Sequence, residues 1–257
     1  MNTPDFLIQN VKKYPNEPAL SSKDKSGNWE TDSWNDVHKS VIDVAKSLLH
    51  HNIGQNDKIS IYSYNRKEWN YIYLATQFIN SAAVGIYHTS SSNEVEWVAG
   101  NSESKIIFVG NNPNDNQEND KMPINRLLEA LPKLNNVELV VTLPEVTSSE
   151  NSKIISWDKF IENGKSTDSS KVLDLLSKIK DEHTSSLIYT SGTTGNPKGV
   201  ELVHNNWNFL MDALSTPLTF FQGEKTISWL PGAHVFGQAL DNHFWVRRAM
   251  HSFIVDN

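Results

Sequence analysis

The amino-acid sequence predicts an α/β protein in which helices alternate with the short apolar strands of mostly parallel sheets. Several segments carry apolar residues at helical spacing, and each is followed by a short run of aliphatic residues typical of a buried strand. Because consecutive parallel strands need a long connection, usually a helix, this alternation indicates a parallel sheet with helices on both faces. The 257 residues, of which 38% are hydrophobic, suffice for one large domain or two small ones.

The first strong element is a helix predicted over residues 33–51. From Val37 onward, its apolar residues repeat at helical spacing. Ser33 and Asp36 form a capping pair at its start, and Gly54 suits its end. We expect further helices over 66–80, 94–100, 124–131 and 171–179, the first of these with Trp69, Ile72, Tyr73 and Gln77 near one face. We expect strands over 58–64, 82–87, 106–109, 137–142 and 186–189, and polar connectors over 111–120, 145–153 and 163–170.

The composition excludes several classes of function. Lys and Arg number 23 against 30 Asp and Glu, a net charge of −7, which argues against binding to a nucleic-acid backbone but not to a single nucleotide. The absence of cysteine excludes disulfides, thiolate zinc sites and cysteine nucleophiles, and the nine histidines lack metal-ligand spacing, so we expect no metal held mainly by protein ligands. No long apolar run and no secretory signal are visible, so the expected location is cytoplasmic.

The segment 187–206, LIYTSGTTGNPKGVELVHNN, carries the chemistry. Its glycines let the backbone turn sharply and approach a ligand, and amides and hydroxyls that curl at a strand end form a nest for a polyanion. The spacing differs from the Walker loop, and an ordinary turn would not gather so many glycines, hydroxyls and a lysine. The residues expected to bind phosphates are Thr190, Ser191, Gly192, Thr193, Thr194, Gly195, Lys198 and Gly199.

These residues resemble the phosphate-binding motif of the adenylate-forming ligases, the AMP-forming acyl-CoA synthetases. The resemblance extends from about residue 10 to the end of the chain. Within the family, the chain is most similar to the long-chain and bubblegum-type fatty acid–CoA ligases. That similarity rests on NRKEW at 65–69, AAVGIYHTSSSNEVEWVAGNSESKIIFVGN at 82–111 and SWLPGAHVFGQ at 228–238.

The resemblance implies a two-step reaction in which ATP activates a fatty acid as acyl-AMP and CoA then displaces AMP. It implies ATP and CoA as co-substrates, with Mg²⁺ held mainly by ATP itself. Lys198 would act catalytically with the loop, stabilising the charge that develops on the phosphates. His234 matches the motif histidine and would lie by the acyl carboxylate, with Phe236 and Gly237 lining the acyl channel.

The sequence departs from the family pattern at several positions. Glu201 and Val203 follow the loop where relatives usually carry an apolar residue and a serine, and we expect Glu201 to point outward. Gly232 loosens the loop before His234. Family members are usually much longer, and no counterpart of the YGxTE glutamate, the TGD aspartate or the small carboxyl-terminal domain is found. We therefore expect residues 1–257 to form a partial AMP-binding domain.

Other interpretations stay open from the sequence alone. The chain could be a non-catalytic short form that binds nucleotide or fatty acid, or could adenylate another carboxylic acid. His234 by itself would be read as a packed loop histidine, and His204 as a capping or packing residue. Arg247 and Arg248 offer a basic patch for CoA phosphates, although a solvated face is the preferred interpretation. No anchor is visible, but a lipid substrate leaves peripheral contact with a membrane surface open.

Overall fold

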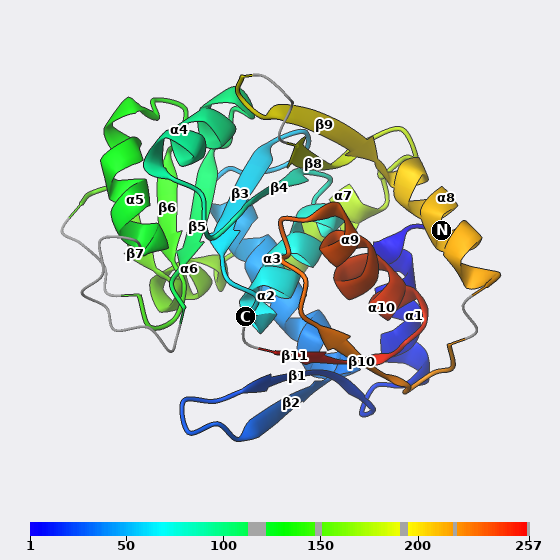
Figure 1. Ribbon diagram of the computed structural model, residues 1–257. Helices are drawn as coiled ribbons and strands as arrows, with labels where there is room; N and C mark the ends of the chain where they lie inside the picture. The colour runs from blue at the N-terminus through cyan, green and yellow to red at the C-terminus, as the bar shows by residue number, and fades with distance from the viewer. Residues whose placement is uncertain (113–121, 147–150, 191–194, 218–219, 256–257) are drawn as a thin grey trace.

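The computed structural model describes residues 1–112, 122–146, 151–190, 195–217 and 220–255. It contains a seven-stranded sheet in the order β7-β6-β5-β3-β4-β8-β9 and a four-stranded sheet in the order β10-β11-β1-β2 (Figure 1). Helices join most strands of the larger sheet, so the predicted α/β class is confirmed.

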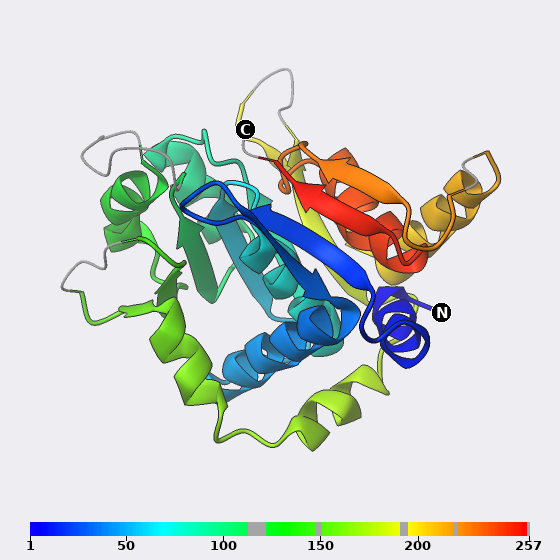
Figure 2. The ribbon, with the colours of Figure 1, turned by 90° about the horizontal axis from the view of Figure 1, so that it is seen from below.

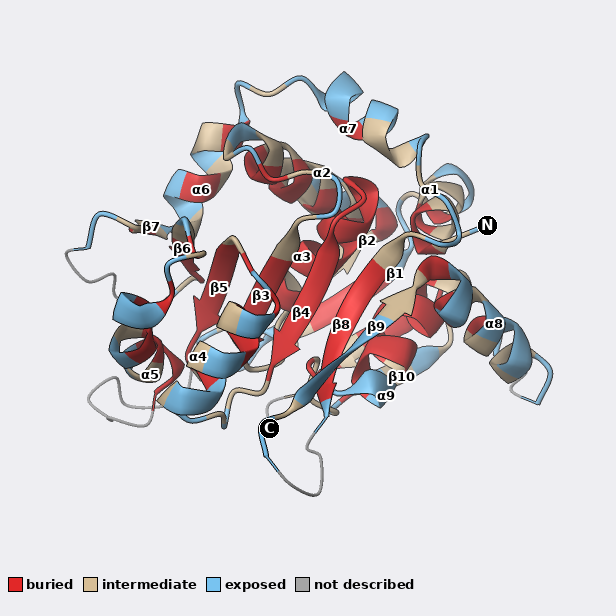
Figure 3. Cartoon of the chain, turned by 90° about the horizontal axis from the view of Figure 1, so that it is seen from above, coloured by how far each residue is buried: buried red, intermediate tan, exposed pale blue. Residues whose placement is uncertain are grey.

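The larger sheet is parallel except at one edge, where β9 pairs antiparallel with β8. Its central strands are buried except at Lys58, the first residue of β3, as expected for a parallel sheet with both faces covered, whereas β9 is largely exposed (Figure 3). The strands are β3 (Lys58–Ser63), β4 (Ala82–Ile86), β5 (Ile106–Gly110), β6 (Leu139–Thr142), β7 (Ile154–Ser156), β8 (Thr184–Thr190) and β9 (Lys198–Val203).

Helices cover both faces of this sheet and divide its core into two apolar clusters. One face packs against α2 (Trp34–His50), α3 (Lys67–Phe78), α6 (Trp157–Gly164) and α7 (Ser169–Leu176). The other face packs against α4 (Ser92–Asn101) and α5 (Pro123–Ala130), which the short 3₁₀ helix η1 (Leu131–Lys133) follows. The first cluster also includes side chains from the helices next to the smaller sheet.

Local signals account for where α2 begins and tertiary packing accounts for the burial of α3. The predicted capping box of α2 is present, because the Asp36 amide donates to Ser33 Oγ at 3.2 Å and the Ser33 amide donates to Asp36 Oδ2 at 2.9 Å. By contrast, α3 is buried on all sides from Trp69 to Phe78, so the expectation of a single buried face was incomplete. The reason is that α3 packs on the larger sheet and also against β1 of the smaller one.

The smaller sheet joins segments from opposite ends of the sequence. Its strands are β1 (Pro18–Lys23), β2 (Trp29–Ser33), β10 (Lys225–Ser228) and β11 (His251–Ile254), and β1 pairs parallel with β11 (Figure 2). The neighbouring helices are α1 (Thr3–Lys13), α8 (His204–Ser215), α9 (Val235–Gln238), the π-helix η2 (Ala239–Phe244) and α10 (Trp245–Arg247). The sequence analysis did not predict α1, β1, β2, β7, α6, α8, β10, α9, η2 or α10.

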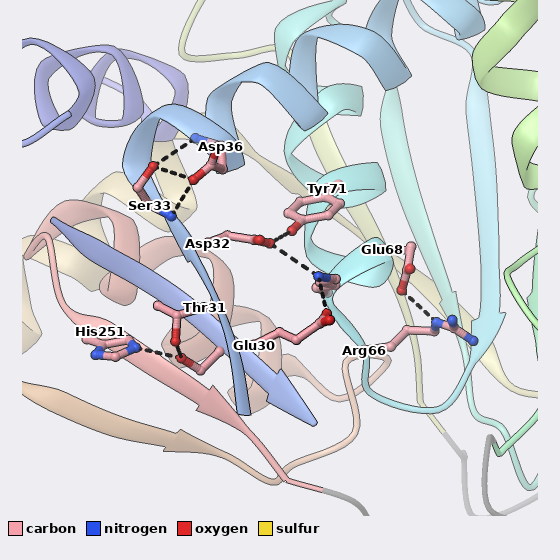
Figure 4. Close-up of polar contacts among 11 residues, drawn as sticks. Glu30, Thr31, Asp32, Ser33, Asp36, Arg66, Glu68, Tyr71 and His251 are labelled. Carbon is pink, nitrogen blue, oxygen red and sulfur yellow. Dashed lines mark hydrogen bonds and ion pairs between the residues drawn. The ribbon is translucent and has the colours of Figure 1, made fainter. Parts of the chain in front are cut away.

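Polar contacts tie the smaller sheet to the start of α3 (Figure 4). The Tyr71 hydroxyl donates to Asp32, and the Lys67 ammonium lies 3.7 Å from the same carboxylate and 3.6 Å from Glu30. Burial raises the pKa of Tyr71, so the hydroxyl keeps its proton and remains the donor. Within the described ranges, no helix is both long and apolar enough to cross a membrane.

Candidate active site

A cavity of about 460 Å³ lies at the carboxyl ends of β4 and β8. Open parallel sheets bind their ligands outside this edge, because strand ends and helix starts converge there. The cavity is lined by Gly85, Ile86, Tyr87, Thr89, Ser90, Glu94, Val98, Ile188, Tyr189, Thr190, Pro197, His234 and Val235. It therefore brings together the end of β8, the start of α4 and the segment that carries His234.

The β8–β9 hairpin carries the predicted phosphate-binding segment to the rim of this cavity. Thr190 lines the cavity and is paired in register with Lys198 on β9. Gly195 has φ +95°, a conformation that favours glycine, and a Cβ on Gly199 would lie 2.9 Å from Tyr189 Cζ. Lys198 and Gly199 are exposed. The predicted phosphate ligands Ser191, Gly192, Thr193 and Thr194 lie outside the described residues.

The end of β8 and the residue before β9 are tied to α4. The Trp97 indole donates from Nε1 to the carbonyl oxygen of Pro197 at 2.8 Å, one residue before Lys198. The Tyr189 hydroxyl donates to Asn101 Oδ1 at 2.8 Å. The sequence analysis did not single out Trp97 or Asn101 as site residues, although the resemblance over 82–111 includes both.

His234 reaches the cavity from the amino-terminal end of α9. Its Nδ1 accepts a hydrogen bond from the Phe236 amide at 3.1 Å, so Nε2 carries the proton of the neutral ring. Phe236 is 52% exposed, and Gly237 packs so closely that a Cβ there would lie 2.5 Å from Pro231 O. Of the three residues predicted to contact the acyl group, the structure places His234 on the cavity surface and does not place Phe236 or Gly237 there.

Gly85 lets the His234 segment sit directly on β4. A Cβ on Gly85 would lie 2.6 Å from the Cα of Ala233, a backbone atom that cannot rotate away. We expect Gly85→Ala to lower the free energy of unfolding by about 1–3 kcal/mol through overpacking. Denaturant titration measures this, with Gly54→Ala as the matched control because an added Cβ there meets nothing within 4 Å. Equal effects of the two substitutions would contradict the contact.

The remaining candidate residues differ in how they are placed. Glu201 is exposed, as expected. Arg247 pairs with Asp212, and Arg248 donates to the Ser215 carbonyl oxygen at 3.0 Å, so neither is simply a solvated charge.

His204 is buried at the start of α8, and this desolvation lowers its pKa to about 4. This burial fits the packing interpretation from the sequence. Among the residues that the structure describes, no three His, Asp or Glu side chains gather as a metal-binding group.

Comparison with known proteins agrees with the fold and with the motifs. The family model described as "AMP-binding enzyme" matches residues 7–257. The chain is 28% identical over 247 residues to the long-chain-fatty-acid–CoA ligase ACSBG2 of Homo sapiens, covering 96% of this chain and 35% of that protein. It is also 28% identical over 254 residues to long chain acyl-CoA synthetase 3 of Arabidopsis thaliana, covering 92% of this chain and 36% of that protein.

Among solved structures, acetoacetyl-CoA synthetase from Streptomyces lividans superposes with a TM-score of 0.85 at 16% identity. The superposition covers 100% of this chain and 38% of the synthetase chain. At 16% identity, this likeness supports the fold alone. The chain spans about a third of the length of the curated relatives it matches. The resemblance inferred from the sequence motifs is confirmed, and the chain belongs to the AMP-binding enzyme family.

Proposed function

We propose that this chain takes part in the ATP-dependent activation of a long-chain fatty acid, first to acyl-AMP and then to acyl-CoA. The observation that carries the proposal is one cavity lined by Thr190, at the start of the phosphate-binding segment, and by His234. The relatives named above are long-chain acyl-CoA ligases and synthetases. In this proposal, residues 1–257 form a partial AMP-binding domain.

The residues present fit a nucleotide and an acyl group. A cavity of about 460 Å³ is within the usual range of roughly 300–1,000 Å³ for small-molecule sites. Its wall combines hydroxyl-bearing residues, Thr89, Ser90 and Thr190, with the apolar residues Ile86 and Val98. Hydroxyl donors suit phosphate oxygens, and the apolar wall suits an acyl chain or a base.

The proposed chemistry depends on stabilising negative charge as pyrophosphate leaves. Lys198 would attract the β and γ phosphates, while the amides and hydroxyls of the loop donate to their oxygens. Mg²⁺, carried by ATP, supplies further neutralisation of the same charge. The protonated Nε2 of His234 would donate to the carboxylate or to the adenylate. CoA then accepts the acyl group as a thioester.

We propose a cytoplasmic location for the chain. We also propose peripheral contact with a membrane surface, from which the chain would bind its fatty acid. Exposed aromatic side chains support that contact, because such side chains insert readily at the membrane interface. Phe209 is 75% exposed on α8, and Phe221 is 69% exposed in the turn before β10.

Binding of ATP to the purified chain tests the role of Lys198. We expect Lys198→Ala to weaken ATP binding by about 10- to 150-fold, because a charge-assisted hydrogen bond contributes about 1.5–3 kcal/mol. Isothermal calorimetry measures this. The matched control is Lys171→Ala, an exposed lysine on α7, a helix near the end of β8 opposite to Thr190 (Figure 3). No heat with ATP, or equal affinity of Lys198→Ala and the unmodified chain, would overturn the assignment.

Non-hydrolysable acyl-adenylate analogues test the acyl group. We expect palmitoyl-sulfamoyl adenosine to bind more tightly than the benzoyl analogue, because a long chain buries more apolar surface. Tighter binding of the benzoyl analogue would indicate a ligase for an aryl acid. Binding of ATP with no binding of either analogue would indicate a nucleotide-binding protein.

A further inference from the structure

Asn65 lies between β3 and α3 and does not contribute to the cavity wall, yet it holds the segment that carries His234. Its Nδ2 donates to the carbonyl oxygen of Leu230 at 2.7 Å, and its Oδ1 accepts from the amide of Gly232 at 2.9 Å. Both halves of one side-chain amide therefore bind the backbone of one turn, 165 and 167 positions away in the sequence.

The turn from Leu230 to Gly232 needs such an external support. Gly232 provides little stiffness of its own, and no larger residue fits, because a Cβ there would lie 2.6 Å from Trp69 Cε2. Trp69 packs against Gly232, and Gly85 packs against Ala233, the residue after the turn, but these contacts are apolar and carry no hydrogen bond. The bond that Asn65 donates and the bond that it accepts together fix the distance and the orientation of the turn relative to Asn65.

The position of this turn determines the position of His234, because the two are joined by a backbone hydrogen bond. The His234 amide donates to the carbonyl oxygen of Pro231 at 2.8 Å, and its imidazole caps α9 by accepting from the Phe236 amide. These two bonds leave the ring little freedom once the turn is fixed. At the far end of the same segment, Asn70 of α3 donates to the carbonyl oxygen of Asp241 at 2.9 Å. Asn65, just before α3, and Asn70, in its first turns, therefore hold the two sides of the His234 segment.

We propose that Asn65 is a positioning residue that sets the location and tautomer of the His234 imidazole in the cavity. It acts through the backbone of the Leu230–Gly232 turn and does not touch the substrate. The consequence for acyl-adenylate binding rests on the proposed function, whereas the consequence for the imidazole does not.

Nitrogen NMR of the purified chain, labelled at histidine, tests the proposal directly. The spectrum of His234→Gln identifies the His234 signals. In the unmodified chain we expect Nδ1 of His234 to show the shift of an unprotonated ring nitrogen and Nε2 that of a protonated one, because Nδ1 accepts from Phe236. In Asn65→Ala, we expect the two shifts to move toward each other as the tautomers mix. Asn65→Asp keeps the acceptor for Gly232 and loses the donor to Leu230. In this variant, the nitrogen shifts of His234 should lie between those of the unmodified chain and those of Asn65→Ala.

Asn10→Asp is the matched control. Asn10 is buried, and its Nδ2 donates to a distant backbone carbonyl, that of Val246, at 2.7 Å. We expect Asn10→Asp to lower the stability of the chain without shifting the NMR signals of His234. Unchanged His234 signals in Asn65→Ala, or equal changes in Asn10→Asp, would overturn the proposal.

Ligand binding supplies a second readout that general destabilisation would not reproduce. We expect Asn65→Ala to weaken binding of palmitoyl-sulfamoyl adenosine about tenfold, since small displacements at a reacting centre have large effects. The affinity for ATP should be unchanged, because the phosphate-binding segment belongs to β8 and β9 and Asn65 bonds the Leu230–Gly232 turn. Equal losses for both ligands would overturn a specific role in positioning. If the unmodified chain binds neither ligand, the proposed function fails, and the NMR shifts still decide the role of Asn65.

Discussion

Replacing Trp245 with alanine is expected to lower the free energy of unfolding by about 3–5 kcal/mol, the usual range for a large buried aromatic side chain. Trp245 is fully buried and stacks on Trp34, with ring centroids 5.2 Å apart. Its Nε1 donates to the carbonyl oxygens of Ala19 at 2.9 Å and Met250 at 3.0 Å. One side chain therefore joins α10 to β1, to α2 and to the turn before β11.

Chemical denaturation of the chain measures this effect, and two further variants separate its causes. Trp245→Phe keeps a ring for stacking but removes the donor to both carbonyls, for which we expect a loss of about 1–3 kcal/mol. Trp229→Ala is the control, because that side chain is 58% exposed and its removal should change stability by no more than about 0.5 kcal/mol. A loss in Trp245→Ala no greater than in Trp229→Ala would contradict the packing described.

The second large effect is a pH dependence that arises from Asp241. Burial raises the pKa of Asp241 from its ordinary 3.8 to about 7, and a hydrogen bond from Ser228 Oγ at 2.8 Å partly opposes that rise. Between these two pH values, the folded chain keeps a proton that the unfolded chain has lost. The contribution of Asp241 to stability is therefore complete below about pH 3.8 and is lost as the pH rises to about 7.

The magnitude of this contribution is about 4 kcal/mol, since each unit of pKa difference corresponds to about 1.4 kcal/mol. Two buried histidines act in the opposite sense, because desolvation lowers the pKa of His204 to about 4 and lowers the pKa of His243 as well. Their contributions are complete above the ordinary pKa of 6.5 and are lost as the pH falls toward their folded values.

A comparison of the unmodified chain with Asp241→Asn isolates the aspartate, because the histidines are common to both. We expect the free energy of unfolding of Asp241→Asn, relative to the unmodified chain, to rise by about 4 kcal/mol between pH 4 and pH 8. Ser228→Ala removes the opposing hydrogen bond and should extend the pH range to higher values. Parallel stability profiles for Asp241→Asn and the unmodified chain would show that Asp241 keeps an ordinary pKa when folded.

Much of the larger sheet could be predicted because its signals are local. Strands such as β5 are continuous apolar runs, and α2 begins at a capping box that can be read from four consecutive residues. The smaller sheet could not be predicted in this way. The segments of β1 and β2 are short and partly polar, and the pairing of β1 with β11 joins residues such as Ser21 and His251, which are 230 positions apart.

Part of the candidate site could be proposed from the sequence for the same reason. The expected phosphate-binding segment is a contiguous motif, so Thr190 and Lys198 could be proposed as ligands from the sequence without knowledge of their neighbours. Trp97 and Asn65 act through hydrogen bonds to the backbone of remote segments, which no local pattern encodes. Their identification required the structure.

The sequence by itself determined the alternation of helices and strands, the start of α2 and the family to which the chain belongs, because each depends on residues close together in the chain. The tertiary structure alone decided which residues meet. It placed Thr190 and His234 in one cavity, buried α3 on all sides and raised the pKa of Asp241. The physical reason is that shared cavities, close packing and desolvation are produced by segments far apart in the sequence.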